Sequence, residues 1–319
     1  MKGLTDIPGI RVGHVSDYEA LTGCTAILCE QGAVGGVDIR GSASGTEETP
    51  ALDPGHLDDS VHAIMLAGGS AFGLEAASGV RRYLARRGIG VVFGGQHIPI
   101  VAGAILFDLG IGKADVHPNL AMGEAAASAA TDSPVAEGAV GAGTGATVGK
   151  ILGMRHAMKS GIGSATVALD GGVLVASLVA VNAMGDVRDP ATGKIVAGAR
   201  RAPEAREFLD TVEYMTRHSA LPGAPTVPKN TTLAVVATNA RLTKLQARKL
   251  AELGGLGMAR AISPVNTMVD GDIVFALSLG SLLAGIDSLG VAAAEVVAQA
   301  ILRAVESARS MGGLPGLAG

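Results

Sequence analysis

The 319-residue sequence contains no tryptophan, and aromatic residues make up only 3% of it. Hydrophobic residues still account for 48%, and glycine occurs 47 times. A core of that size must therefore be built from Ala, Val, Ile and Leu, with close backbone approaches where glycine permits them. The length suits one large domain or two ordinary ones. No internal repeat is evident, and we treat residues 1–319 as a single domain.

Charge is scarce as well. Charged residues make up 17%, and the formal net charge is -4 at pH 7. A nucleic-acid-binding surface needs a clustered basic excess, so we expect no nucleic-acid partner.

Cysteine is limited to Cys24 and Cys29, too few for a disulfide framework and wrongly spaced for a redox Cys-x-x-Cys pair. The N-terminal residues lack the apolar stretch of a signal peptide. Apolar runs such as residues 172–181 are shorter than the roughly 20 residues of a membrane span. We therefore expect a cytoplasmic protein with no membrane contact.

Short apolar runs alternate with glycine-rich turns and helical patterns. Strands are expected at 61–66, 101–106, 164–169, 172–182, 231–238 and 272–279, and helices at 74–84, 122–130, 201–218, 243–253 and 292–308. The third and fourth strands flank Asp170-Gly171-Gly172, which is typical of a hairpin. Hairpins beside long helices favour a layered α+β architecture with helices packed on sheets.

The junction at Asn230 and Thr231 can carry chemistry. Residues 221–230 hold three prolines and are expected to be exposed and extended, since proline supplies no amide for a β-ladder. Thr231 then begins a β-branched strand. As a new N-terminus, it would combine a nucleophilic hydroxyl with its own α-amino base, whose pKa of about 7.7–8.0 suits proton transfer at neutral pH. Taken alone, an Asn-Thr-Thr triplet such as residues 230–232 is more often simply the beginning of a strand.

Several motifs in a shared order change that interpretation. They are residues 36–41 (GVDIRG), 68–74 (GGSAFGL), 141–147 (GAGTGAT), 181–182 (VN), 230–232 (NTT) with 237–240 (ATNA), and 270–272 (DGD). Together they resemble the L-aminopeptidase/D-esterase family of self-processing hydrolases, which also contains the nylon-oligomer endohydrolases. The resemblance implies a layered αββα sandwich like that of N-terminal-nucleophile hydrolases. It also implies self-cleavage into a larger subunit, 1–230, and a smaller one, 231–319.

The resemblance assigns roles around the junction. Asn230 and Thr231 match the cleavage site, with Asn230 the last residue of the larger subunit and Thr231 the nucleophile. An N-to-O acyl shift would release Thr231 as a new N-terminus. The Thr231 hydroxyl would attack the Asn230 carbonyl carbon, and water would hydrolyse the resulting ester. Asp270 and Asp272 match an acidic pair that would hydrogen-bond and orient the Thr231 hydroxyl and ammonium. Residues i and i+2 of a strand share a face, so both carboxylates can point to one site.

Three further residues complete the expected site. Asn182 matches the residue whose side-chain amide helps to stabilise the oxyanion. Lys150 matches a catalytic-site lysine. Phe107, placed in the substrate-binding region, stands where characterised hydrolases of the family carry a tyrosine. Phenylalanine cannot donate a hydrogen bond, so Asn182, Lys150 and backbone amides are expected to take over that contact.

Other sites fit the sequence less well. Residues 138–150 are glycine-rich, but the glycine spacing before Lys150 is too short for a Walker A loop. The residue after Lys150 is Ile151, where that loop has Ser or Thr. The histidines are scattered and no third carboxylate adjoins residues 270–272, so neither a metal nor a cofactor is expected. Lys159 and Ser160 are interpreted as turn and surface residues, and Ser70 as a helix N-cap.

The function that follows is amide hydrolysis through an acyl-enzyme on Thr231. The substrate is expected to be a short peptide, cut as by an aminopeptidase, or a 6-aminohexanoate (nylon) oligomer. An acyltransferase of the ornithine acetyltransferase type is an alternative. So is a catalytically silent relative, which Phe107 makes more conceivable. The family resemblance also suggests a homo-oligomer, expected to be a homotetramer.

Overall fold

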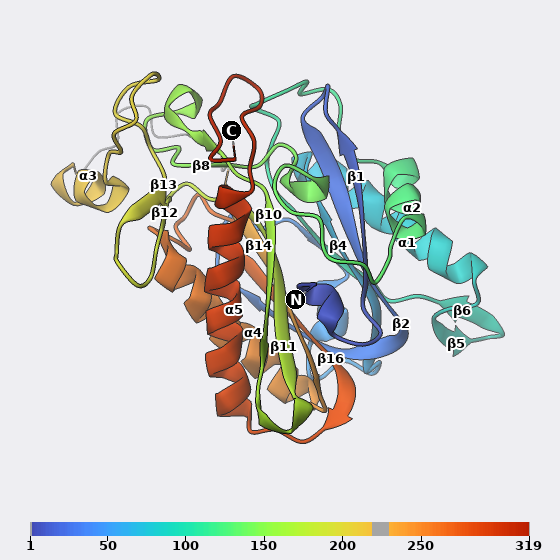
Figure 1. The fold of residues 1–319 in the computed structure, drawn as a ribbon. Helices are drawn as coiled ribbons and strands as arrows, with labels where there is room; N and C mark the ends of the chain where they lie inside the picture. Colours follow the sequence, from blue (N-terminus) through green and yellow to red (C-terminus); the bar gives the residue numbers. More distant parts are fainter. Residues whose placement is uncertain (1, 219–229, 319) are drawn as a thin grey trace.

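The computed structural model describes residues 2–218 and 230–318 (Figure 1). A nine-stranded mixed sheet has the order β10-β11-β14-β16-β2-β4-β7-β3, with β1 paired to β2. Its strands are β1 (Arg11–Asp17), β2 (Thr22–Ile39), β3 (Thr46–Glu47), β4 (Ser60–Ala67), β7 (Val101–Ile105), β10 (Ile162–Ala168), β11 (Leu174–Asn182), β14 (Thr231–Ala240) and β16 (Ile273–Leu282). The shorter strands are β5 (Val91–Phe93), β6 (Gln96–Ile98), β8 (Thr147–Val148), β9 (Met158–Lys159), β12 (Asp186–Arg188), β13 (Ile195–Ala197) and β15 (Ile262–Ser263).

The sheet folds over itself along its longest strand, β2. The first part of β2 pairs with β1 and β4, and its last part pairs with β16. The pairing with β4 shifts register between Leu28 and Ala33, where the extra residues let the strand bend. The two halves of the sheet therefore lie face to face over a shared apolar core, which includes Ile64, Leu178, Val235 and Phe275.

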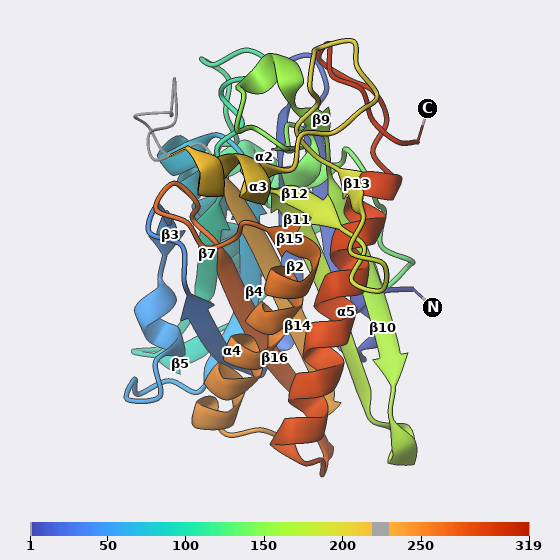
Figure 2. The ribbon, with the colours of Figure 1, turned by 90° about the vertical axis from the view of Figure 1, so that its left-hand side faces the viewer.

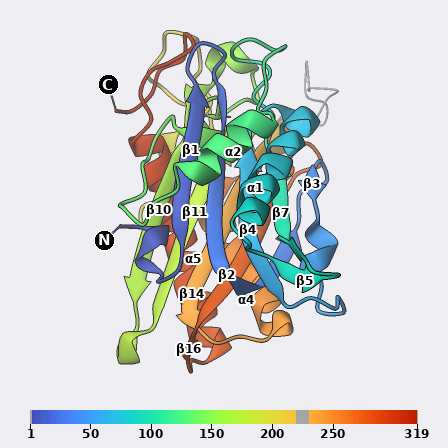
Figure 3. The same cartoon turned by 90° about the vertical axis from the view of Figure 1, so that its right-hand side faces the viewer.

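Two pairs of helices cover the outer faces. One pair is α1 (Glu75–Arg86) with α2 (Leu120–Ser128), and the other is α4 (Lys244–Ala261) with α5 (Ile286–Glu306). The short helix α3 (Thr211–Arg217) belongs to neither pair. Figure 2 shows α4 and α5 side by side over the half that contains β10, β11, β14 and β16. Figure 3 shows α1 and α2 on the opposite face, beside β1, β2, β4 and β7.

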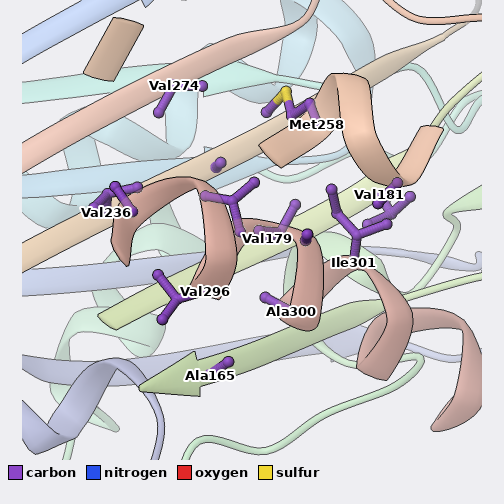
Figure 4. Close-up of a cluster of buried hydrophobic side chains, with 14 of the residues drawn as sticks. Ala165, Val179, Val181, Val236, Met258, Val274, Val296, Ala300 and Ile301 are labelled. Carbon is purple, nitrogen blue, oxygen red and sulfur yellow. The ribbon is translucent and has the colours of Figure 1, made fainter. Parts of the chain in front are cut away.

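Side-chain alternation supplies an apolar core at each interface between these layers. The core between sheet and helices contains Val179, Val181 and Val236 of the sheet (Figure 4). Ile301 of α5 and Met258 of α4 belong to the same core. The neighbouring strand positions face the middle core instead, as the period of two in a strand requires. The layers run helix, sheet, sheet, helix, which confirms the αββα prediction. Helix α5 is long and apolar enough to cross a membrane, but 67% of its apolar window is buried in this protein.

Some local predictions need correction. The helix expected at 201–218 is limited to Thr211–Arg217, because residues 199–209 fold back in a strand-like arrangement with an Arg200–Phe208 bridge. Ser70 is not an N-cap; it is the first residue of a 3-10 helix, Ser70–Leu74, and it has a φ of 54°. The hairpin around residues 170–172 is confirmed, with β10 and β11 antiparallel. The proline-rich segment lies mostly outside the described residues.

Candidate active site

The peptide bond between Asn230 and Thr231 lies where β14 begins. Asn230 forms a parallel bridge with Asp270, just ahead of the parallel pairing of β14 with β16. The Thr231 hydroxyl donates to the Asn230 carbonyl oxygen at 2.5 Å, and the Gly271 backbone N–H donates to the same oxygen at 2.9 Å. The carbonyl therefore has a hydroxyl and a polarising amide beside it.

Backbone packing leaves no room for a side chain at residue 271. A Cβ on Gly271 would lie 2.8 Å from the Thr231 hydroxyl oxygen and 2.7 Å from the Ala43 carbonyl oxygen. Ala43 in turn donates its N–H to the Asp270 carbonyl at 2.9 Å. The glycine therefore permits the close approach of three chain segments at the junction.

Asp270 and Asp272 lie beside the junction, and both carboxylates accept backbone N–H groups. Asp272 accepts from the N–H of Thr232 at 2.6 Å and from that of Asn266 at 2.9 Å. Asp270 accepts from the N–H of Met184 at 3.3 Å and from Thr267. In the structure the Thr231 hydroxyl donates to the Asn230 carbonyl oxygen, whereas the carboxylate contact was predicted for Thr231 as a chain end.

Asn182 lies directly opposite Thr231, because β11 and β14 pair residue for residue at that point. Its side-chain oxygen accepts from Lys150 Nζ at 2.8 Å and from the N–H and hydroxyl of Thr147 at 3.1 and 3.3 Å. Its side-chain Nδ2 donates to the Phe107 carbonyl at 2.9 Å. The carboxamide is thus oriented by donors on its oxygen and by an acceptor on its nitrogen.

The site is electrostatically unusual because its charged groups are buried. Burial lowers the pKa of Lys150 to about 7, although the Asp270 and Asp272 carboxylates act in the opposite direction. Burial and the neighbouring Asp270 charge raise the pKa of Asp272. Ionisable groups that titrate near neutral pH are suited to proton transfer at working pH.

All the residues predicted for the site are brought together. They are Asn230 and Thr231 at the junction, Asp270 and Asp272 on one side, and Asn182, Lys150 and Phe107 on the other. Phe107 contributes its backbone carbonyl, and its side chain lines a narrow cavity beside Lys150. Gly110, Ile111 and Met154 line this cavity and also a surface cleft of about 470 Å³. Among residues 2–218 and 230–318, no cluster of three or more His, Cys, Asp or Glu could hold a metal.

Sequence reasoning missed three participants and misplaced a fourth. Gly271 contributes its backbone N–H, and Thr147 contributes its N–H and its hydroxyl. In the sequence, only the motifs that contain these two residues could have drawn attention to them. Asp108 is buried next to Phe107. Lys159, expected at the surface, is fully buried with Ser160, so that prediction was wrong. Its ammonium group is accommodated because it donates to the backbone carbonyls of a buried loop.

The four αββα layers are those of the N-terminal-nucleophile hydrolase fold, and the family and relatives of the chain identify it as an amide hydrolase. The family model for Peptidase family S58 matches residues 2–318, and the chain belongs to this family. An uncharacterized aminopeptidase of Mycobacterium tuberculosis (strain ATCC 25618 / H37Rv) is 39% identical over 344 residues, covering 99% of this chain and 96% of that protein.

Two further comparisons agree with this. A 6-aminohexanoate-oligomer endohydrolase of Kocuria sp. (strain KY2) is 32% identical over 314 residues, covering 94% of this chain and 85% of that protein. The solved structure of the L-aminopeptidase D-Ala-esterase/amidase of Ochrobactrum anthropi superposes with a TM-score of 0.72 at 20% identity, covering 98% of this chain and 88% of that one. That structure is described as a variant of the N-terminal-nucleophile hydrolase fold.

Proposed function

We propose that the chain cleaves itself between Asn230 and Thr231 and then hydrolyses amides through an acyl-enzyme on Thr231. The observation that carries this proposal is the geometry of the junction. The Thr231 hydroxyl is 2.5 Å from the Asn230 carbonyl oxygen, and the Gly271 N–H donates to that oxygen at 2.9 Å. The nucleophile and an oxyanion donor are both in place before cleavage.

Processing is an N-to-O acyl shift followed by hydrolysis. The Thr231 hydroxyl oxygen bonds to the Asn230 carbonyl carbon, and the negative charge that develops on the carbonyl oxygen is stabilised by the Gly271 N–H. The C–N bond then breaks, and the proton lost by the hydroxyl is balanced by the one gained at the Thr231 nitrogen. Water hydrolyses the resulting ester, which leaves a carboxylate on Asn230 and an α-amino group on Thr231.

Turnover uses the residue so released. The α-amino group accepts the hydroxyl proton as Thr231 attacks the substrate carbonyl, and it returns a proton to the leaving amine. Asp270 and Asp272 lie beside the new N-terminus and favour its correct orientation. Asn182, opposite Thr231, is the proposed side-chain donor to the substrate oxyanion, and Lys150 fixes the oxygen of that carboxamide at 2.8 Å.

The proposed substrates are short peptides cut as by an aminopeptidase. The 39% identity to a mycobacterial protein named as an aminopeptidase supports this choice. Oligomers of 6-aminohexanoate are the second candidate, supported by the 32% identity to the endohydrolase. Both substrates need the same nucleophile and oxyanion donors. We further propose a homotetramer, as the family resemblance suggests, and a cytoplasmic location, as the low cysteine content suggests.

A denaturing gel and a substrate panel test the proposal. Processing predicts fragments of about 23 and about 9 kDa from the 31.7 kDa chain, divided by segment length. The mature protein should then hydrolyse aminoacyl anilides, 6-aminohexanoate oligomers or both. A single band that never matures would refute the nucleophile. Acetyl transfer from acetylornithine to glutamate would indicate an acyltransferase. Complete inactivity of the processed protein would indicate a catalytically silent relative.

A further inference from the structure

We propose that Asp108 and Lys159, two buried charges that do not touch the junction, are positioning residues for the Asn182 carboxamide. The inference rests on the proposed function, in which Asn182 donates to the oxyanion. Each residue acts on one end of that carboxamide through a single intervening chain segment.

Lys159 controls the oxygen end. Its ammonium donates to the carbonyls of Thr144 and Ala146 at 2.9 and 2.7 Å, and its side chain is fully buried. Ala146 directly precedes Thr147, and Thr144 lies three residues before it. The N–H and hydroxyl of Thr147 donate to the Asn182 side-chain oxygen. Lys159 is also the direct β-ladder partner of Thr147 in the pairing of β8 with β9. Movement of the Lys159 head group would therefore displace Thr147.

Asp108 controls the nitrogen end. Its carboxylate accepts from the Gly69 N–H and from the Thr22 hydroxyl, both at 2.7 Å. Its neighbour Phe107 supplies the carbonyl that accepts from Asn182 Nδ2. Glycine motifs enclose the carboxylate, because a Cβ on Gly68 would lie 2.0 Å from one of its oxygens. The turn that follows β7 thus has little freedom to shift the Phe107 carbonyl.

The orientation matters because the two ends of a carboxamide are not equivalent. Rotation by 180° would put the NH₂ group of Asn182 against the Lys150 ammonium and the Thr147 donors, and would remove the proposed donor from its place. The opposite charges support one another as well. Burial lowers the pKa of Lys159 to about 7, and the negative charge of Asp108 acts in the opposite direction. Burial likewise raises the pKa of Asp108 to about 6, and the positive charge of Lys159 opposes that shift.

The test compares Lys159→Met with Lys244→Met. Lys244 is a matched control: it is also buried, and its ammonium donates to the backbone carbonyls of Ala51 and Asp58 at 3.1 and 2.7 Å. Among the residues that the structure describes, none of its hydrogen bonds reaches the proposed site. Both variants are expected to lower the melting temperature. Only Lys159→Met is expected to lower kcat of the matured enzyme, by roughly tenfold to a hundredfold, with KM within about threefold.

Conservative variants keep the test informative. Lys159→Arg retains a cation and should recover part of kcat, while Asp108→Asn retains the shape and should lower kcat without a comparable change in KM. If Lys159→Met fails to mature, Lys159→Arg and Asp108→Asn provide the same kcat comparison. A wild-type kcat in both Asp108→Asn and the Lys159 variant that matures overturns the inference, as does an equal loss in Lys244→Met.

Failure of the underlying function gives a different pattern. Asn182→Ala is assayed beside these variants. Wild-type turnover in Asn182→Ala would refute the oxyanion role itself. Loss of turnover in Asn182→Ala together with wild-type turnover in the Lys159 and Asp108 variants would refute only the positioning inference.

Discussion

Replacing Asn182 with alanine is expected to separate self-cleavage from turnover. In the uncleaved chain the Asn230 carbonyl already receives a hydrogen bond from the Gly271 N–H at 2.9 Å, while Asn182 Nδ2 donates to Phe107. Processing therefore has a backbone donor that the substitution leaves in place. A substrate carbonyl bound at Thr231 from the β11 side has Asn182 as its proposed side-chain donor.

The expected loss of turnover follows from that role. Removal of one oxyanion donor typically costs about 2.7–4 kcal/mol of transition-state stabilisation, a decrease in kcat of about 10²–10³. Alanine also removes the acceptor for Thr147 and one acceptor for Lys150. Lys150 keeps the main-chain carbonyl of Asn182 at 2.9 Å. Unsatisfied buried donors cost about 1–3 kcal/mol each, so the variant should also be less stable.

The assay measures both steps on the same preparation. Maturation is followed as loss of the full-length band with time, and kcat is measured once the band has disappeared. We expect the maturation rate to stay within about tenfold of wild type, while kcat falls as stated. Asn182→Asp is the matched control, because it keeps an oxygen for Lys150 and Thr147 and removes the Nδ2 donor; it should lose turnover with a smaller loss of stability.

Two results would contradict this reasoning. Wild-type kcat in matured Asn182→Ala would show that the side-chain amide does not stabilise the oxyanion. Complete arrest of maturation in a variant that is folded by circular dichroism would show that Gly271 is insufficient for processing.

The remaining predictions concern the nucleophile, the acid pair, pH and assembly. Thr231→Ala should remain a single 31.7 kDa band without activity, and cleavage at the same bond would contradict the assignment. Asp272→Asn should slow maturation or turnover, since its carboxylate accepts from the Thr232 N–H, and wild-type rates for both would remove it from the site. Burial lowers the pKa of His14 to about 4, below its ordinary 6.5, so the unfolded chain binds the proton first. The free energy of unfolding should therefore fall as pH drops from 6.5 to 4, by about 2 kcal/mol after allowance for partial exposure. Urea unfolding measures this change, and the decrease should be smaller in His14→Gln. Light scattering of the purified protein should give the mass of four chains; a monomer mass would refute the tetramer.

Local signals in the sequence were sufficient for the main elements. The strand at Thr231 and the hairpin at residues 170–172 are specified by β-branched residues and by glycine at the turn, both of which act over a few residues. The helix expected at 201–218 failed because residues 199–209 make backbone contacts with one another and with His156 instead. Such contacts override a charged, helix-like pattern.

The site was harder to predict because its contacts join distant segments. Family resemblance could name Asn182 and Thr231, but only strand register places them opposite one another. Lys159 shows the limit most clearly. A lysine beside glycines usually belongs to an exposed turn, and nothing local predicts that Thr144 and Ala146 will present their carbonyls to it. Burial of a charge depends on partners that the whole fold supplies.

The position of β14 between β11 and β16 places Thr231 between the donors that the two proposed reactions would use. On the β16 side, the Gly271 N–H donates to the Asn230 carbonyl, the group attacked in the proposed self-cleavage. On the β11 side, Asn182 pairs with Thr231 and carries an oriented carboxamide. In the proposed sequence of events, cleavage converts the Asn230 carbonyl into a carboxylate and leaves Thr231 at a chain end. The two proposed reactions would then depend on donors on opposite sides of β14, so a substitution on one side is expected to impair one reaction and spare the other.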